Sequence, residues 1–371
     1  MLSDRLRVAR ESLGLRQADA AGQLGIAESG ICEMEAGRRE PKAAQLAALA
    51  QLYRRPLDFF FSDEPVAQDV VLWRERPSDE VTAKKIQREF FALCEQYQSL
   101  EELLGAASGS TLPEDTTPKD AYGFPQAERL AARTWDQFEL GAAPAESLRP
   151  VLEERFFVKI FALPLASEAS AASTRSHRVG PAILLNKDSV HWRHNFDLAH
   201  ELFHLLTWRV FREPTEVSSV EAGEEEERLA NRFAGHLLLP ESPFRERLDP
   251  FLDKAGNCRM SVAQIHELAR SFDVSAEAIV YRCASLLHWH KDRTLGIVEN
   301  VRKFRIWRES EPIEMLPSRY ISLTVQAYGK GLISYKKGAE YLRKGFKQAR
   351  DILEPPEDGA EPDRQITVAA D

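Results

Sequence analysis

The stretch DLAHELFHLL (residues 197–206) decides how the middle of this chain folds. Its apolar residues recur at helical spacing, which predicts a helix over about 192–208. Residues four apart on a helix lie almost above one another, so His200 and His204 can bind one metal ion. Glu201 projects beside that point, where its carboxylate can take a proton from a water that the metal activates. The pattern predicts a catalytic zinc site; the alternative is a pair of core histidines with ordinary partners.

A catalytic zinc needs a third protein ligand, and the segment EEEERLANRFAGHLLLP (224–240) offers one. Glu227 and Asn231 are four apart and share a face of a helix predicted over about 224–238. We expect Glu227 to bind the metal and Asn231 to hydrogen-bond a ligand histidine. We expect residues 224–226 to form a solvated first turn, which the helix dipole favours.

These two segments together resemble the ImmA/IrrE family of zinc metallopeptidases, over about residues 80–350 and most specifically over 181–240. After HELFH, the pattern E-x-x-A-N-x-F-A-x-x-L-L-x-P follows. The matching positions are Glu227, Ala230, Asn231, Phe233, Ala234, Leu237, Leu238 and Pro240. The segments PAILLN (181–186), RHNFDLAHE (193–201) and VSAEAIVYR (274–282) also fit. The resemblance implies a zincin-like domain with an HExxH site of the gluzincin type, holding Zn²⁺ through His200, His204 and Glu227 with Glu201 as the base.

Two positions depart from the family pattern. Phe203 stands where members often have a small residue, which we expect to change only the packing of the helix. Leu229 stands where a second acid is common, so Glu227 remains the expected ligand, with its acidic neighbours as alternatives one turn away.

Five other histidines are less informative: His191, His194, His236, His288 and His290. His194 or Arg193 could polarise a substrate carbonyl, but a surface role is the expectation for each.

The N-terminal residues LRQADAAGQLGIAESGICEMEAGRREP (15–41) have the helix, glycine turn, helix layout of a helix-turn-helix. Gly14 is expected to cap the first helix of this region. The segment resembles the Cro/CI-type (XRE) repressor class. The matching positions are Gly14, Gln17, Gly25, Ile31, Glu35, Gly37 and Pro41.

The resemblance places the second helix of this motif in the major groove of an operator. The expected DNA contacts are Gln17, Glu28, Ser29, Gly30, Arg38, Arg39 and Lys42. Residues 1–62 contain 9 basic and 8 acidic side chains, a low balance for tight DNA binding. A protein-docking module and a plain helical bundle therefore remain alternatives, and two copies on paired half-sites are expected for a DNA reader.

The rest of the chain predicts an α+β, mostly helical protein. A helix-turn-helix domain (1–62) precedes a linker with a connecting helix (63–123), the helix itself covering 81–104. A metallopeptidase domain (124–290) contains strands at 156–161 and 181–186, the latter offering an edge to which a substrate segment could add. A mostly helical region (291–353) follows, with a strand-like stretch at 294–309, and the tail (354–371) has a disordered composition.

The composition limits the setting of the protein. Hydrophobic residues make up 43% and the net charge is −9, so globular cores are expected and broad nucleic-acid coating is not. The four cysteines form no CxxC pair, and no stretch has the length of a membrane span. We therefore expect a cytoplasmic protein with no membrane partner.

Two functions remain open at this point. The resemblance implies a DNA-binding regulator with zinc-dependent endopeptidase activity, cleaving a helix-turn-helix repressor to release stress or mobile-element genes. The alternative is a non-catalytic DNA-binding repressor whose zinc domain senses a ligand or is structural. Glu201 favours catalysis because a structural zinc site does not need this carboxylate.

Overall fold

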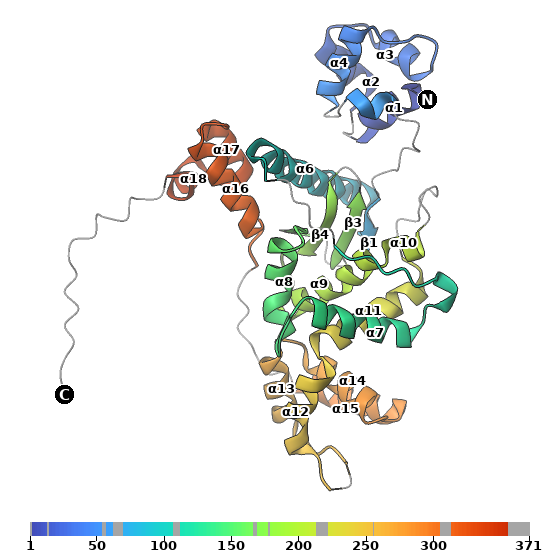
Figure 1. Ribbon diagram of the computed structural model, residues 1–371, viewed down its shortest axis with the longest axis vertical. Coiled ribbons are helices and arrows are strands. Elements are labelled where there is room, and N and C mark those ends of the chain that lie inside the picture. Colours follow the sequence, from blue (N-terminus) through green and yellow to red (C-terminus); the bar gives the residue numbers. More distant parts are fainter. Residues whose placement is uncertain are drawn as a thin grey trace, which may run out of the picture.

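A computed structural model of the chain describes residues 2–12, 15–53, 57–61, 70–106, 112–165, 169–176, 179–212, 222–254, 256–304 and 313–354. The predicted cap at Gly14 and nearly all of the tail lie outside these residues. The described chain is mostly helical with one small sheet, as the sequence predicts (Figure 1). No helix in the described ranges is long and apolar enough to cross a membrane.

The N-terminal helices pack around a core of their own. Helices α1 to α3 hold the motif region and α4 and α5 close the core, with buried side chains that include Leu6, Ile31 and Leu49. Helix α2 ends at Gly25, which begins the turn to α3 at φ 65°, a left-handed conformation that glycine adopts at no steric cost. The bounds are α1 (Leu2–Ser12), α2 (Gln17–Leu24), α3 (Glu28–Glu35), α4 (Ala43–Leu52) and α5 (Leu57–Phe61).

A four-stranded sheet in the order β1-β3-β4-β2 lies at the centre of the remaining chain. Strands β2 and β4 are parallel, whereas β3 is antiparallel to both β1 and β4. The bounds are β1 (Leu72–Trp73), β2 (Lys159–Leu163), β3 (Ala171–Ser176) and β4 (Gly180–Asn186). Helices cover both faces of the sheet, which explains why residues 181–185 of PAILLN are continuously apolar.

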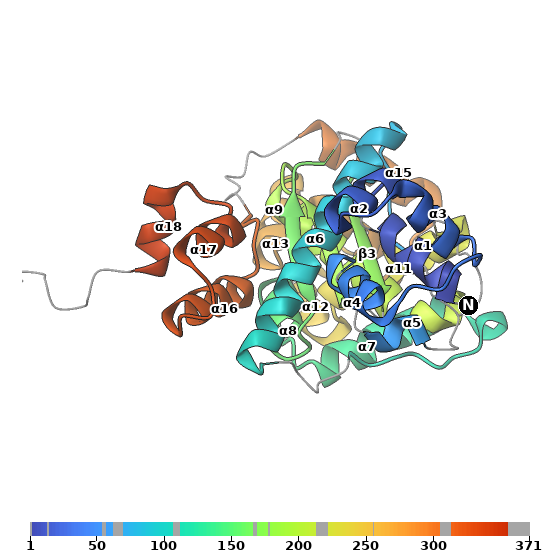
Figure 2. The same cartoon turned by 90° about the horizontal axis from the view of Figure 1, so that it is seen from above.

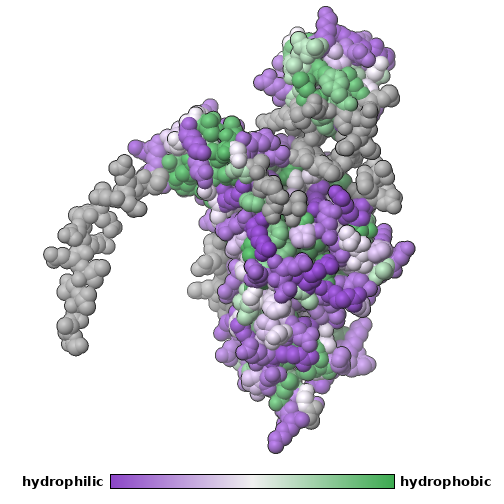
Figure 3. Space-filling model, in the orientation of Figure 1, coloured by the Kyte–Doolittle hydropathy of each residue, from purple (hydrophilic) through white to green (hydrophobic). Residues whose placement is uncertain are grey.

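Helix α6 (Glu80–Leu104) and α16 (Ser318–Gly329) pack on one face of the sheet, and α9 (His191–Leu206) packs on the other (Figure 1). Helices α17 (Tyr335–Leu342) and α18 (Phe346–Leu353) follow α16 to one side of the molecule (Figure 2). Apolar residues gather on the visible surface of these last helices, whereas the central part is mostly hydrophilic (Figure 3).

The other helices surround α9 or extend below it. They are α7 (Phe124–Gln137), α8 (Pro144–Glu154), α10 (Trp208–Phe211), α11 (Glu224–Leu238), α12 (Glu241–Leu248), α13 (Val262–Ser271), α14 (Ala276–Leu286) and α15 (Lys291–Lys303). Short 3-10 helices η1 (Lys119–Ala121) and η2 (Asp249–Phe251) complete them.

The structure corrects two of the predicted strand features. Residues 294–303, predicted to be strand-like, lie in helix α15, because Thr294, Val298 and Val301 are buried at helical spacing. The prediction that PAILLN offers an open edge is also wrong. Strand β4 is an inner strand with β3 on one side and β2 on the other, so both rows of its backbone groups are paired.

The segment 63–123, predicted as a linker with a connecting helix, also contributes a strand to the sheet. Val71, Leu72 and Trp73 are buried, and Leu72 and Trp73 pair with β3. Part of the segment between the helix-turn-helix and α6 thus belongs to the sheet.

Candidate metal centre

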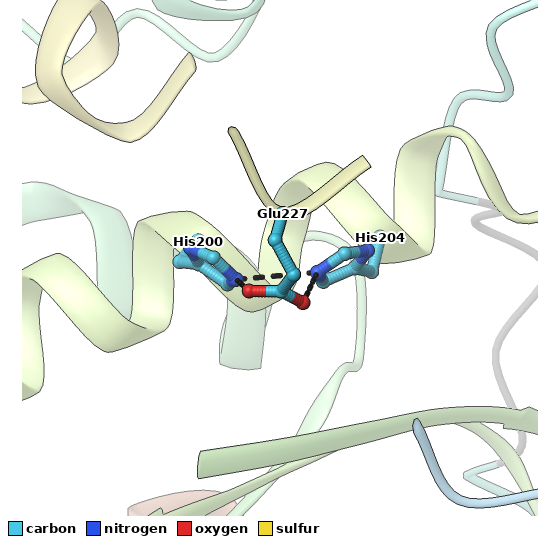
Figure 4. Close-up of side chains that lie close together, drawn as sticks. All are labelled: His200, His204 and Glu227. Atoms are coloured by element: carbon cyan, nitrogen blue, oxygen red, sulfur yellow. Dashed lines mark hydrogen bonds and ion pairs between the residues drawn. The ribbon is translucent and has the colours of Figure 1, made fainter. Parts of the chain in front are cut away.

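Helices α9 and α11 bring His200, His204 and Glu227 together (Figure 4). The Nε2 atoms of the two histidines are 3.2 Å apart. The carboxylate of Glu227 spans them, with 3.1 Å from Oε2 to His200 Nε2 and 3.3 Å from Oε1 to His204 Nε2. The predicted i, i+4 pair and the predicted acid of the next helix therefore point at one place.

The donor set fits a zinc ion. Zinc binds histidine nitrogen and carboxylate oxygen at about 2.0–2.2 Å in a tetrahedron, which separates neighbouring ligand atoms by about 3.3 Å. The nitrogen–nitrogen separation of 3.2 Å is close to that edge length, and so are the two nitrogen–oxygen separations of 3.1 and 3.3 Å, each of which goes to a different oxygen of Glu227. Three protein ligands leave one tetrahedral position for water or substrate, as catalytic zinc sites require.

Each histidine is held by a hydrogen bond from its other ring nitrogen. His200 Nδ1 lies 3.2 Å from Asn231 Oδ1, the contact that the sequence predicts for a ligand histidine. His204 Nδ1 lies 2.8 Å from Glu226 Oε1. In both contacts an oxygen accepts from Nδ1, so each imidazole can offer Nε2 to a metal once the proton that Nε2 shares with Glu227 has left.

Glu226 corrects the prediction of a wholly solvated acidic turn. Glu224 and Glu225 are exposed as expected, but Glu226 is buried and also accepts from Arg212 Nη2 at 2.7 Å. A signal for this was present in the sequence. Counting seven residues back from the apolar Phe233 gives position 226, so helical spacing places it on the buried face.

Glu201 lies in the same buried region, directly after His200 on α9. Its side chain is fully buried, and neither carboxylate oxygen has a hydrogen-bond partner at normal distance within the described ranges, although the Ser173 hydroxyl lies near enough to oppose the effect of burial on its pKa. Burial raises the pKa of Glu201 to about 7. A carboxylate with such a pKa can both accept and return a proton near neutral pH.

Glu227 has the opposite electrostatic environment. Burial opposes its ionisation, but the hydrogen bonds from His200 and His204 outweigh burial and lower its pKa to about 2. The pKa values of two acids on neighbouring helices are thus shifted in opposite directions, that of Glu227 downward and that of Glu201 upward.

Arg74 also contacts the residues around the cluster, and the sequence did not predict it. It follows β1, and its side chain forms an ion pair with Asp197 on α9 and donates to Asn231 Oδ1 at 3.3 Å. Since Arg74 and Asp197 are 123 positions apart in the sequence, no local spacing could have indicated the contact.

The other candidate residues lie away from the cluster or have different partners. His194 is buried, against the expectation of a surface role, and its Nε2 lies 2.7 Å from the carbonyl oxygen of Asn186. Arg193 is exposed and lies 3.4 Å from Asp197. Phe203 packs against Phe233 and Leu229 is buried, so both departures from the family pattern lie in the core.

The predicted DNA contacts divide into two groups. Glu28, Ser29, Arg38, Arg39 and Lys42 are exposed on or after α3. Gly30 is buried, and Gln17 donates to Glu35 within the domain at 2.9 Å.

Comparison with known proteins finds a family match for the region of the metal cluster and another for the N-terminal helices. The family profile of the IrrE N-terminal-like domain, a peptidase family, matches residues 153–284. A helix-turn-helix domain profile matches residues 1–58. No curated protein matched the chain.

Two solved structures are distantly similar. A Mycobacterium tuberculosis transcriptional regulator is 17% identical with a TM-score of 0.32, covering 51% of this chain and 51% of its own. Bacillus thuringiensis PlcR, solved in complex with the peptide PapR7 and DNA, is 12% identical with a TM-score of 0.16, covering 90% of this chain and 99% of its own. This chain thus spans about half of the first of these structures.

The two profile matches and the helical fold agree with one architecture. The helix-turn-helix domain supports a DNA-binding regulator, and the IrrE-like domain supports a metallopeptidase-like fold. The chain thus combines an N-terminal helix-turn-helix domain with an IrrE-like domain, the architecture that its sequence resemblance implies.

Proposed function

We propose that this protein is a DNA-binding regulator with zinc-dependent endopeptidase activity, and that its substrate is a repressor protein of the helix-turn-helix class. The observation that carries the proposal is Glu201. Its carboxylate is buried and lacks a hydrogen-bond partner within the described ranges, beside three side chains whose geometry fits zinc. A buried, unpartnered carboxylate is costly for the fold, and proton transfer gives it a use.

The residues of the chain divide the chemistry among them. Zinc, when bound, would supply Lewis-acid polarisation of the scissile carbonyl and make water acidic enough to attack near neutral pH. Glu201 takes the proton of the attacking water and returns it to the leaving amine. His200, His204 and Glu227 hold the metal, while Asn231 and Glu226 orient the two imidazoles.

The second candidate is a regulator that binds zinc but cleaves nothing. The burial of the cluster favours it, because His200, Glu201 and His204 have no exposed surface and only Glu227, 23% exposed in its side chain, reaches solvent. A peptide would need an opening of this site before it could reach the metal.

A cleavage assay separates the two candidates. The full chain, loaded with zinc, is incubated with the helix-turn-helix regulator encoded beside its gene, with and without its operator DNA, and the products are identified by mass spectrometry. Cleavage at one bond, abolished by a chelator and restored by zinc, supports the peptidase. An intact regulator under all conditions, with zinc bound, supports the non-catalytic candidate.

Asn231→Ala should weaken zinc affinity by about 10- to 100-fold, the usual range for loss of a group that orients a ligand. The reason is its hydrogen bond to His200, which sets the direction of the Nε2 lone pair. Affinity is measured by competition with a chromophoric chelator. Arg228→Ala, an exposed change on the same helix, is the control, and an unchanged affinity in Asn231→Ala would contradict the role.

Arg38→Ala together with Arg39→Ala should lower operator affinity about equally across sequences and flatten its salt dependence, because phosphate contacts carry no base information. Both side chains are exposed just after α3, and neither has an ion pair within the described ranges. Ser29→Ala should instead change the preferred sequence. Selection from a random DNA pool at low salt tests the idea, and a full chain that selects no sequence would leave protein docking as the role of this domain.

A further inference from the structure

The metal centre has a partner that lies outside the region matched by the peptidase profile. Arg74 precedes that region by 79 positions, counting from 74 to 153. Its backbone is fixed to the sheet, since Leu72 and Trp73 pair with β3 and Arg74 N donates to the carbonyl oxygen of Ala171 at 3.1 Å. The segment that follows the helix-turn-helix domain therefore places the guanidinium of Arg74 beside α9 and α11.

The guanidinium of Arg74 bridges the two helices that supply the metal ligands. On α9 it forms an ion pair with Asp197, one turn before His200. On α11 its Nη2 donates to Asn231 Oδ1 at 3.3 Å. The same oxygen lies 3.2 Å from His200 Nδ1. Two donors therefore converge on one acceptor, which requires that the amide oxygen, and not its nitrogen, face the histidine.

The setting of Asp197 makes this contact hard to replace. The Asp197 side chain is 0% exposed, and that of Arg74 is 12% exposed. The second cation near Asp197 is Arg193, whose side chain is 43% exposed and whose Nε lies 3.4 Å away. Arg74 also covers the ring of Phe196 at 5.3 Å. A planar guanidinium can serve Asp197 and Asn231 at once, whereas an ammonium offers a single point charge.

We propose that Arg74 is a positioning residue of the metal centre: through Asn231 it fixes the imidazole of His200, so the site is completed by the segment that follows the helix-turn-helix domain. The proposal rests on the zinc site of the proposed function but not on cleavage. Its consequence is that displacement of residues 70–74 from the sheet edge loosens the binding of zinc.

The test compares Arg74→Lys and Arg74→Met with Asn231→Ala in the full chain. Zinc affinity is measured by chelator competition, the site geometry by the visible spectrum of the cobalt-loaded protein, and folding by thermal melting. Arg74→Lys keeps a cation beside Asp197, so it should melt close to the unaltered protein. It should nevertheless bind zinc about 10- to 100-fold more weakly and change the cobalt spectrum, because its single head cannot also hold Asn231.

Two further variants make the test specific. The double variant Arg74→Lys/Asn231→Ala should bind zinc no more weakly than Asn231→Ala alone, because both changes break the same chain of contacts. Arg193→Met removes the other cation near Asp197 without touching Asn231, so its zinc affinity and cobalt spectrum should stay unchanged.

Unchanged zinc affinity in Arg74→Lys, or additive losses in the double variant, would overturn the proposal. Failure of the unaltered chain to bind zinc would overturn both it and the proposed function. If the unaltered chain binds zinc and the variants behave as expected but no repressor is cleaved, the peptidase function fails and the role of Arg74 stands.

Discussion

Replacing Glu201 with glutamine should lower the rate of repressor cleavage by about 10²- to 10⁴-fold, the contribution of a positioned general base. The amide has nearly the shape of the carboxylate but cannot accept the proton of the attacking water. Glu201 is not one of the three ligand side chains, and its oxygens lack hydrogen-bond partners in the described part of the chain. Zinc content and melting temperature should therefore stay close to those of the unaltered protein.

The measurement is a single-turnover cleavage rate with saturating enzyme, taken beside metal analysis of the same sample. Glu225→Gln is the matched control, because it makes the same chemical change at an exposed position outside the cluster. Its rate should equal that of the unaltered chain. Full cleavage by a zinc-loaded Glu201→Gln protein would contradict the assignment of the base.

Replacing His204 with alanine should remove zinc almost completely after dialysis, with a loss of affinity greater than about 100-fold, the upper range for loss of an orienting group alone. The change leaves only His200 and Glu227 of the three protein ligands. It also takes away the hydrogen-bond donor of the buried Glu226, which keeps Arg212 as a partner. The folded chain should survive in a metal-free form.

Metal analysis after dialysis checks this result, with circular dichroism to confirm the fold. His290→Ala removes an exposed histidine outside the cluster and should retain one zinc per chain. Full zinc occupancy in His204→Ala would mean that the cluster of His200, His204 and Glu227 does not bind the metal as proposed.

The cluster also shows which contacts can be predicted from residue spacing along a single helix. The i, i+4 relation of His200 and His204 and the shared face of Glu227 and Asn231 follow from helix geometry, so these four residues could be predicted without a structure. The same geometry had information about Glu226, whose distance from Phe233 places it on the buried face of α11. The burial of Glu226 was not predicted because it belongs to a run of four glutamates, and such a composition alone suggests a solvated turn.

The sequence by itself determined most of the helices, the two apolar strands β2 and β4, and the residue types that the cluster of His200, His204 and Glu227 brings together, because each depends on spacing within one segment. The tertiary structure alone decided what lies beside them. It placed β4 inside the sheet instead of at an edge, and it brought Arg74 to Asp197 across 123 residues. The physical reason is that backbone periodicity acts between near neighbours, whereas strand order and a buried ion pair depend on how distant segments pack.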